Sequence, residues 1–384
     1  MRIDLFSTCL GLLPAFAVLG LAASATAQEA GERMPIGTNF WNISWHRADD
    51  VFRGGWQNVT GENPWNPVFL EQVEPYSCFR FMDWDGTNHS PRVTWSDRPS
   101  RDNPEQNPVA YEWMIDLCNR KQADFWVTLP HQAQWAYSHQ LAELLKEKLD
   151  PGLKIYVEYS NETWNGMFRQ TQYCEERGSA LDLPGVSEKE KGWAYHVYAA
   201  VRHFEQFQQV FGEDSDRVVY VIAGFVSNPG VAEHHVKVLQ DEQVNPKGFE
   251  PDAYAIAPYF GHHIDPQAED AVEQLYEAMD DALANCARHR EVLEGTGMKL
   301  IAYEAGQHTA EPGAPELNRR QVMYDVYMDY LTRMDDHMQG VFAHYVHVGA
   351  RPENKHMWGA LEYTGQSPEE APKYRAILDY LRSE

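Results

Sequence analysis

Two glutamates each follow a short apolar run that is typical of a β-strand. Glu162 follows the run 154–159, within the string Glu-Tyr-Ser-Asn-Glu-Thr-Trp-Asn at 158–165, and Glu304 follows the run 299–303. Hydrolysis of a sugar acetal needs two carboxyl groups that face one bond. One protonates the leaving oxygen, and the other attacks carbon or activates water. This chemistry is open to Glu162 and Glu304 if the fold brings them face to face.

Eight apolar, β-prone runs recur along the chain, and the two glutamates follow the fourth and the seventh. Several runs are apolar at almost every position, which is typical of strands covered on both faces of a parallel sheet. Helical periodicity, with apolar residues three and four positions apart, separates them. The expected strands are 36–41, 78–82, 124–129, 154–159, 218–223, 253–257, 299–303 and 340–345, and the expected helices are 110–122, 138–147, 193–211, 268–293, 316–334 and 374–381.

Strand alternating with helix predicts βαβ units and a parallel sheet. Eight units in one chain predict an α/β fold of the (β/α)8 (TIM) barrel type, with long loops after strands 2 and 8. An open doubly wound sheet is the alternative, and no GxGxxG turn follows the first strand to support its nucleotide-binding forms. Strands four and seven lie on opposite sides of a closed barrel, so their terminal glutamates would face each other across its mouth.

An Asn-Glu pair after the fourth strand and a Glu after the seventh resemble the hallmark of the clan A retaining glycoside hydrolases. That clan includes endoglucanases, mannanases, xylanases and β-galactosidases. The resemblance implies that Glu162 is the acid/base and Glu304 the nucleophile, and that Asn161 bonds the sugar 2-hydroxyl. It also implies a double displacement that retains configuration and requires no cofactor.

The same resemblance assigns roles to four further residues. Arg80, at the end of strand two, would pair with the nucleophile and lower the pKa of Glu304. Tyr259, after strand six, would hydrogen-bond that carboxylate. His131, after strand three, would contact sugar, and Trp358, beyond strand eight, would form the aromatic floor of the sugar site.

Other residues have competing interpretations. Glu158 could serve as the acid, but its place inside the strand favours a structural role within the barrel. Six tryptophans could stack on sugars, of which about half should only pack: Trp41, Trp45, Trp84, Trp95, Trp135 and Trp164. Trp41 is expected to bind substrate.

Two rival functions remain open: a glycan-binding barrel without catalysis, and a metal-dependent hydrolase or lyase on the same fold. The histidine pairs at 234–235 and 262–263, with His344 and His347, suggest a metal. Neighbouring histidines diverge on strands and on helices alike, so no metal site is expected.

The N-terminus predicts export. A basic tip, an apolar run over 5–23 and Ala25-Thr26-Ala27 form a secretory signal peptide with cleavage after Ala27, which leaves residues 28–384 as one catalytic domain in a secreted or periplasmic protein. Cysteines 78, 118, 174 and 286 remain, with no CxxC spacing and no deducible pairing. The net charge of −25 disfavours nucleic acid and anionic membranes as partners, and leaves neutral oligo- or polysaccharides as the expected substrates.

Overall fold

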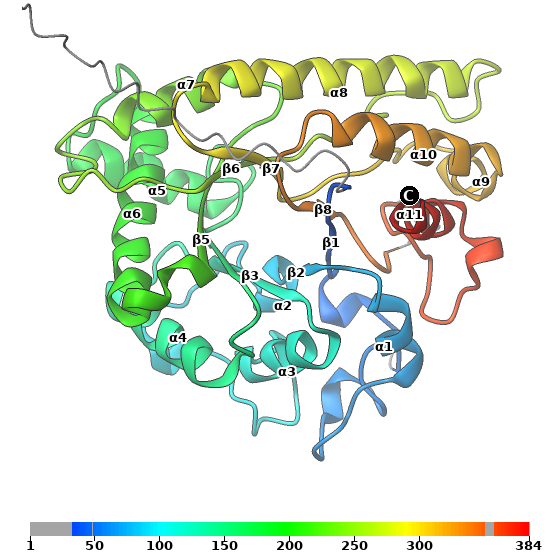
Figure 1. Cartoon of the computed structure of the whole chain (residues 1–384), viewed down its shortest axis with the longest axis horizontal. Helices are drawn as coiled ribbons and strands as arrows, with labels where there is room; N and C mark the ends of the chain where they lie inside the picture. The colour runs from blue at the N-terminus through cyan, green and yellow to red at the C-terminus, as the bar shows by residue number, and fades with distance from the viewer. Residues whose placement is uncertain (1–32, 48, 350–356, 384) are drawn as a thin grey trace, which may run out of the picture. The chain divides into compact units, whose positions relative to one another are not determined.

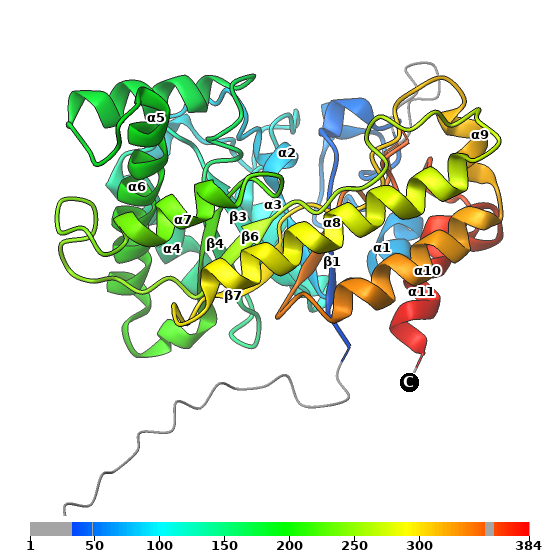
Figure 2. The same ribbon diagram turned by 90° about the horizontal axis from the view of Figure 1, so that it is seen from above.

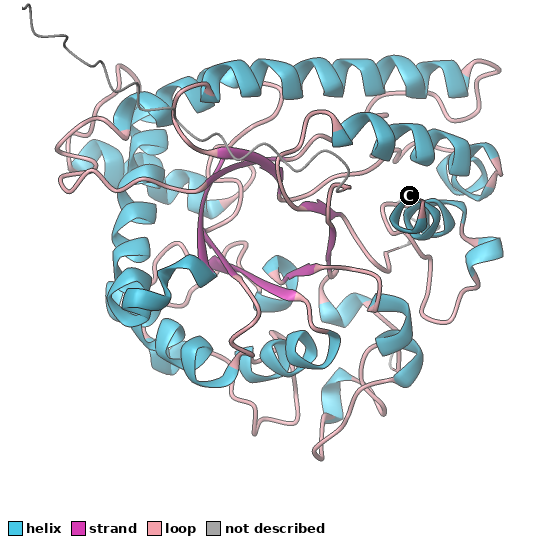
Figure 3. Ribbon diagram, viewed as in Figure 1, coloured by secondary structure: helices cyan, strands magenta, loops and turns pink. Residues whose placement is uncertain are grey.

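A closed ring of eight parallel strands forms the centre of the protein (Figures 1 and 3). The computed structural model describes residues 33–47, 49–349 and 357–383. The predicted (β/α)8 fold is confirmed, and every expected strand is present. The strands are β1 (Ile36–Asn39), β2 (Cys78–Arg80), β3 (Asp124–Leu129), β4 (Ile155–Tyr159), β5 (Val218–Ala223), β6 (Ala253–Ile256), β7 (Lys299–Ala302) and β8 (Phe342–His344).

The ring closes because β1 pairs with β8 in parallel as well as with β2. Strand residues alternate between the barrel interior and the helix layer. On β4, Glu158 points inward and Tyr159 points outward, and both are buried. This double burial explains why the strands read as nearly continuous apolar runs.

Helices surround the ring, and α8 and α10 run along its outside (Figure 2). The helices are α1 (Pro67–Val73), α2 (Met82–Asp85), α3 (Tyr111–Lys121), α4 (Trp135–Lys148), α5 (Arg169–Ala180), α6 (Glu188–Phe211), α7 (Pro229–Val238), α8 (Ala271–Leu293), α9 (Ala314–Arg319), α10 (Val322–Asp335) and α11 (Pro372–Arg382).

The expected helix 316–334 is wrong as a single element. Arg320 has extended backbone angles (φ −70°, ψ 145°), and the chain forms two helices, α9 and α10, on either side of it. Sequence periodicity also missed α1, α5 and α7. The segment of α5 is rich in charged and polar residues, so its buried face leaves only a weak periodic signal.

The connections after β2 and β8 position much of the site. The segment from β2 to α3 contains only α2 and a short 3-10 turn at Trp95–Asp97, and the segment from β8 to α11 contains one at Pro368–Glu370. Residues 33–384 cluster as one compact unit. The predicted signal peptide lies outside the described residues, and no described helix is long and apolar enough to cross a membrane. The four remaining cysteines are buried free thiols.

Candidate active site

Glu162 lies three residues beyond β4 on a turn with an uncommon backbone conformation. Its φ is +44°, and that of Ser160 is +60°. Left-handed backbone at non-glycine residues costs roughly 1–3 kcal/mol each and clusters at functional sites. The Glu162 carboxylate accepts hydrogen bonds from the Tyr303 hydroxyl (3.1 Å) and from Asn165 Nδ2 (2.8 Å). The strained turn thus presents a carboxylate whose orientation is fixed by two donors.

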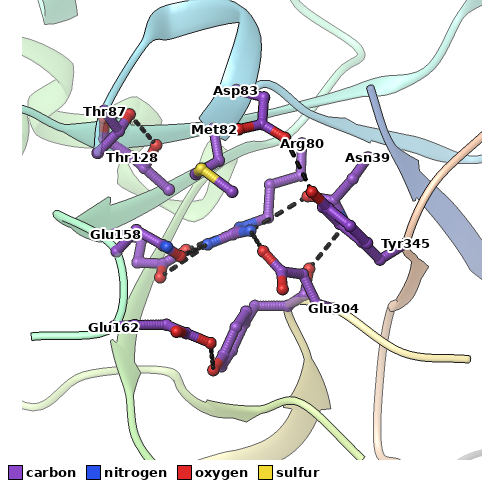
Figure 4. A network of polar contacts seen from close by, with 12 residues as sticks. Asn39, Arg80, Met82, Asp83, Thr87, Thr128, Glu158, Glu162, Glu304 and Tyr345 are labelled. Atoms are coloured by element: carbon purple, nitrogen blue, oxygen red, sulfur yellow. Dashed lines mark hydrogen bonds and ion pairs between the residues drawn. The ribbon is translucent and has the colours of Figure 1, made fainter. Parts of the chain in front are cut away.

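Glu304 lies two residues beyond β7 and is 6% exposed. One carboxylate oxygen accepts a hydrogen bond from Arg80 Nη1 (2.9 Å), and the other accepts one from the Tyr259 hydroxyl (2.9 Å). The structure therefore brings Arg80, Tyr259 and Glu304 together. Figure 4 shows the Glu162 and Glu304 side chains extending toward one another from β4 and β7.

Arg80 connects the nucleophile candidate to the interior of the barrel. Its guanidinium binds Glu158 through two bonds, from Nε (3.0 Å) and Nη2 (3.1 Å), and Trp126 Nε1 donates to the same carboxylate (2.9 Å). Glu158 is 1% exposed, which supports its structural interpretation. Arg80 is therefore the ion-pair partner of two buried carboxylates, Glu158 and Glu304. If its guanidinium moved, both carboxylates would lose that partner.

The environment separates the proton affinities of the two candidate catalytic groups. Burial raises the pKa of Glu162 to about 7, and the negative charge of Glu304 adds to the increase. Burial also raises the pKa of Glu304, while Arg80 and the Tyr259 hydrogen bond act against it. Arg80 does lower the pKa of Glu304, as expected, but the loss of solvent outweighs this attraction and the net shift is upward. The direct ion pair with Arg80 favours the ionised form of Glu304, and Glu162 forms no ion pair with a described residue.

Asn161 is held between Arg80 and the loop after β2. Its side-chain oxygen accepts a hydrogen bond from Arg80 Nη2 (2.9 Å), and its Nδ2 donates to Asn88 Oδ1 (3.1 Å). Gln170 Nε2 donates to the same Asn88 oxygen (2.6 Å). Asn161 is thus oriented beside Glu162.

A third carboxyl group borders the site and was missed by the sequence interpretation. Asp83, three residues beyond Arg80, is partly exposed and accepts a hydrogen bond from the Tyr345 hydroxyl (3.0 Å). Burial raises the pKa of Asp83 to about 7, with a further contribution from Glu304. Tyr345 comes directly after β8 and packs edge-on against Tyr259 at 6.2 Å. The sequence signal that could have identified Asp83 and Tyr345 is their position just beyond the ends of β2 and β8.

Trp358 reaches the site through the long connection after β8. Its ring lies 6.1 Å from Tyr345 and 5.5 Å from His308, and it packs edge-on against Trp41 at 6.0 Å. Trp41 borders a hollow of about 450 Å³ that Trp45 also lines. The structure therefore joins Trp41 and Trp358 in one aromatic wall that is continuous with Tyr345.

His131 is a predicted site residue that the structure places away from the carboxyl pair. It is 3% exposed, and its ring packs against Tyr173 of α5 at 5.2 Å. Its neighbours, including Gln132 at 3.3 Å, lie on the outer side of β3 and β4. The strand-end position alone could not reveal this, because the loop after β3 turns toward the helix layer.

The described histidines form no metal cluster, and no group of three or more His, Cys, Asp or Glu among the described residues could hold an ion. His235 contacts the Tyr254 hydroxyl (3.1 Å), His344 the Tyr327 hydroxyl (3.2 Å) and His347 the Tyr76 hydroxyl (3.4 Å). Each of these three imidazoles is buried in a packing contact of its own.

Comparison with solved structures identifies several barrels of similar shape. An α-L-arabinofuranosidase from Thermotoga maritima matches with 15% identity and a TM-score of 0.54, over 90% of this chain and 69% of the other. A Bacteroidetes-affiliated GH5 cellulase matches with 11% identity and a TM-score of 0.52, over 92% of both chains. A family 26 endo-β-1,4-mannanase from Cellulomonas fimi matches with 12% identity and a TM-score of 0.50, over 92% and 71%.

At identities this low, the structural match shows a shared fold and no more. No family model matches the chain, and no curated protein matches it in sequence.

Proposed function

We propose that this protein is an exported glycoside hydrolase that cleaves β-linked neutral glycans with retention of configuration. The observation that carries the proposal is the asymmetric carboxyl pair at the mouth of the barrel. Glu304 is ion-paired with Arg80 and bonded to Tyr259, whereas Glu162 has a pKa of about 7 and forms no ion pair with a described residue. Two carboxyl groups whose environments separate their pKa values are suited to nucleophile and acid.

In the first step, ionised Glu304 attacks the anomeric carbon. The bond from that carbon to the glycosidic oxygen breaks, and Glu162 gives its proton to the departing oxygen. The product is a glycosyl ester on Glu304 and a carboxylate on Glu162. Arg80 and Tyr259 hold the attacking carboxylate in position throughout.

In the second step, Glu162 accepts a proton from water as the water oxygen attacks the anomeric carbon. The ester bond breaks, Glu304 becomes a carboxylate again, and Glu162 regains its proton. Two inversions at one carbon give net retention. The chain's own residues supply every group in this scheme.

Charge and aromatic surface support a neutral substrate. Around the cleavage point, Arg80 is the one described cation in contact with Glu158 or Glu304, and the whole chain has a net charge of −25. Trp358 and Tyr345 are partly exposed and offer ring faces for the apolar faces of sugars, and buried Trp41 packs against Trp358. The cellulase and the mannanase of similar fold are named for β-linked glucan and mannan, and we infer a substrate of that class.

Export is part of the proposal and rests on the apolar run 5–23 and the Ala25-Thr26-Ala27 end. Expression of the full chain in a secreting host, followed by N-terminal sequencing of the product, tests it. A mature protein that begins at Gln28 is expected, and retention of Met1 in the cell fraction would contradict it.

The function is tested by turnover of soluble glucan, mannan and xylan and of their aryl glycosides. The anomer released first is read by proton NMR, and retention gives the configuration of the substrate. Glu304→Gln and Glu162→Gln are each expected to lower kcat by at least about 10²-fold on the natural linkage. Glu147→Gln, at an exposed carboxyl on α4, is the matched control and should leave kcat unchanged.

Each rival function predicts a different result. A product of inverted configuration would mean that the two carboxyl groups are catalytic but that water, and not Glu304, attacks the anomeric carbon. Binding of glycans with no turnover of any of them would favour a non-catalytic barrel. Loss of turnover in chelator, restored by a divalent cation, would favour a metal-dependent enzyme.

A further inference from the structure

A second hollow, of about 510 Å³ including the part open to solvent, lies outside the barrel between α4, α5 and α6. Trp135, the first residue of α4, borders it and is 38% exposed. Tyr173 and exposed Arg177, four residues apart on α5, present neighbouring side chains to it. Gln132 and His131, from the connection between β3 and α4, form a further part of its wall.

The wall of the barrel separates this hollow from the candidate catalytic pair. Glu158 and Tyr159 are neighbours on β4 and point to opposite faces of the strand. Glu158 binds Arg80 inside the barrel, whereas Tyr159 lines the hollow and donates a hydrogen bond to the His131 carbonyl (2.8 Å). The hollow is therefore a different site from the mouth occupied by Glu162.

Its lining combines aromatic surface with polar groups that have bonding capacity left. His131 is only 3% exposed, and its Nδ1 has no hydrogen-bond partner among the described residues. A buried polar atom without a partner is unfavourable, so a ligand hydroxyl or a water that supplies one is favoured. The Gln132 amide and the Arg177 guanidinium add donors at the edge of the aromatic surface.

We propose that this hollow is a second sugar site, which binds one glycosyl unit of a neutral polysaccharide away from the cleavage point. A pyranose ring has an apolar face of C–H groups and an edge of hydroxyls. Trp135 and Tyr173 match the face, and Gln132, Arg177 and His131 match the edge. Arg177 is the only Lys or Arg among the described residues that line the hollow and is preceded on α5 by Glu175 and Glu176, so the site does not select an anion.

The choice of a glycan as ligand rests on the proposed function, and the site adds a consequence to it. A polymer held at the hollow and at the mouth together has a raised effective concentration at the catalytic pair. A substrate of one sugar cannot reach both places. The hollow should therefore matter for polysaccharide and not for an aryl monoglycoside.

Binding is measured in the full chain carrying Glu304→Gln, so that turnover does not consume the probe. Isothermal titration with soluble β-glucan, galactomannan and arabinoxylan gives Kd for this variant alone and with Trp135→Ala added. We expect Kd for at least one of the three to rise about tenfold, the usual loss on truncating a central aromatic contact. Arg177→Ala should also weaken binding, and Trp135→Phe should keep most of it.

Val186→Ala is the control, since Val186 is a 96% exposed apolar residue outside the hollow. Circular dichroism and the Tm show whether each variant is folded, and Arg177→Ala tests the site if Trp135→Ala is not. The proposal is overturned if neither variant changes Kd, if none of the three glycans binds, or if only a polyuronate binds.

The same variants in the active enzyme separate this proposal from the proposed function. Trp135→Ala should lower kcat/KM on the polysaccharide severalfold and leave kcat/KM on an aryl monoglycoside unchanged. An equal loss of kcat/KM on both substrates would mean that Trp135 supports the fold as a whole, and it would contradict a second sugar site. Absence of turnover by the wild-type chain would contradict the proposed hydrolase function. The titration would still show whether the hollow binds a glycan.

Discussion

Single side chains set the charge balance of the site. Arg80 is fully buried, and its pKa is raised because the attraction of Glu158 and Glu304 outweighs the cost of burial. All five N–H groups of Arg80 are engaged: Glu158 accepts two hydrogen bonds, and Asn39, Asn161 and Glu304 accept one each. Breaking such a buried pair costs roughly 3–5 kcal/mol because a charge is left uncompensated. A fixed Arg80 therefore fixes the Glu304 carboxylate as well.

The first residue-scale prediction concerns the pH dependence of catalysis. Glu162 acts while protonated, and its raised pKa keeps it so up to about pH 7. We expect kcat/KM to fall above pH 7, approaching about tenfold per pH unit. Glu162→Gln, assayed on an aryl glycoside with a good leaving group, should lose this limb. Asp83→Asn is the control, because Asp83 has a similar pKa, and this variant should keep the fall of kcat/KM above pH 7. If the fall disappears in Asp83→Asn, it reports the titration of Asp83 and not that of Glu162.

The second concerns Asp83 as a contact for substrate. Its Oδ2 accepts a hydrogen bond from the Tyr345 hydroxyl, the residue is partly exposed, and its carboxyl group is near enough to Glu304 for the two charges to repel. We expect Asp83→Ala to raise KM for a neutral substrate severalfold, up to about tenfold, through the loss of a hydrogen bond. Tyr345→Phe, which keeps the ring, should raise KM less. Steady-state kinetics measure both, and an unchanged KM with a lowered Tm would leave Asp83 with a structural role only.

Secondary-structure elements deliver these side chains through their ends. The carboxyl ends of β2, β4, β6, β7 and β8 supply Arg80, Glu162, Tyr259, Glu304 and Tyr345. The turn after β4 is held from outside by α5, whose Gln170 Nε2 donates to the Asn161 carbonyl (2.9 Å) and whose Thr171 hydroxyl donates to the Asn165 carbonyl (2.5 Å). The seating of α5 on α6 thus supports the turn that carries Glu162.

The element-scale prediction tests that seating. At Gly178, on the face of α5 toward α6, an added Cβ would come within 2.0 Å of the Lys191 carbonyl oxygen, and backbone cannot yield as a side-chain tip can. We expect Gly178→Ala to lower the free energy of unfolding by about 1–3 kcal/mol in a urea titration. Gly166→Ala is the matched control, since nothing lies within 4 Å of its added Cβ. Equal stability of the two variants would mean that α5 shifts freely on α6.

For the whole molecule, protonation equilibria of buried groups link stability to pH. Burial lowers the pKa of six imidazoles to about 3 or 4, well below the usual 6.5: His46, His131, His196, His203, His344 and His347. In the unfolded chain these groups take up protons as the pH falls through 6.5, and in the folded protein they do not. Their contribution to stability is present above pH 6.5 and is lost on acidification.

Glu162 and Asp83 act in the opposite direction, because their raised pKa values favour the folded state as the pH falls from 7 toward 4. Among the described residues, eleven imidazoles have a lowered pKa and eight carboxyls have a raised one, so we expect the free energy of unfolding and the Tm to fall between pH 7 and pH 5. Each net proton contributes up to about 1.4 kcal/mol per pH unit. His347→Gln should make the dependence shallower, and a Tm that holds or rises toward pH 5 would contradict the prediction.

The sequence by itself determined the barrel and its two glutamates. Eight runs covered on both faces, separated by helical periodicity, have few other parallel arrangements, and closure then places every strand end at one mouth. Glu162 and Glu304 were found by that rule, since a residue just past a strand end needs no tertiary detail to be located. Arg80 and Tyr259 were assigned through the resemblance to the clan A hydrolases.

Only the tertiary structure decided what each strand-end residue contacts. Loop direction sent His131 to the outer hollow, and the connection after β8 brought Trp358 to Tyr345. The division of Arg80 between Glu158 and Glu304, and the upward pKa shift of Glu304, depend on burial and on distances of about 3 Å. Those quantities arise from contacts between residues far apart in the chain, and local sequence patterns do not encode them.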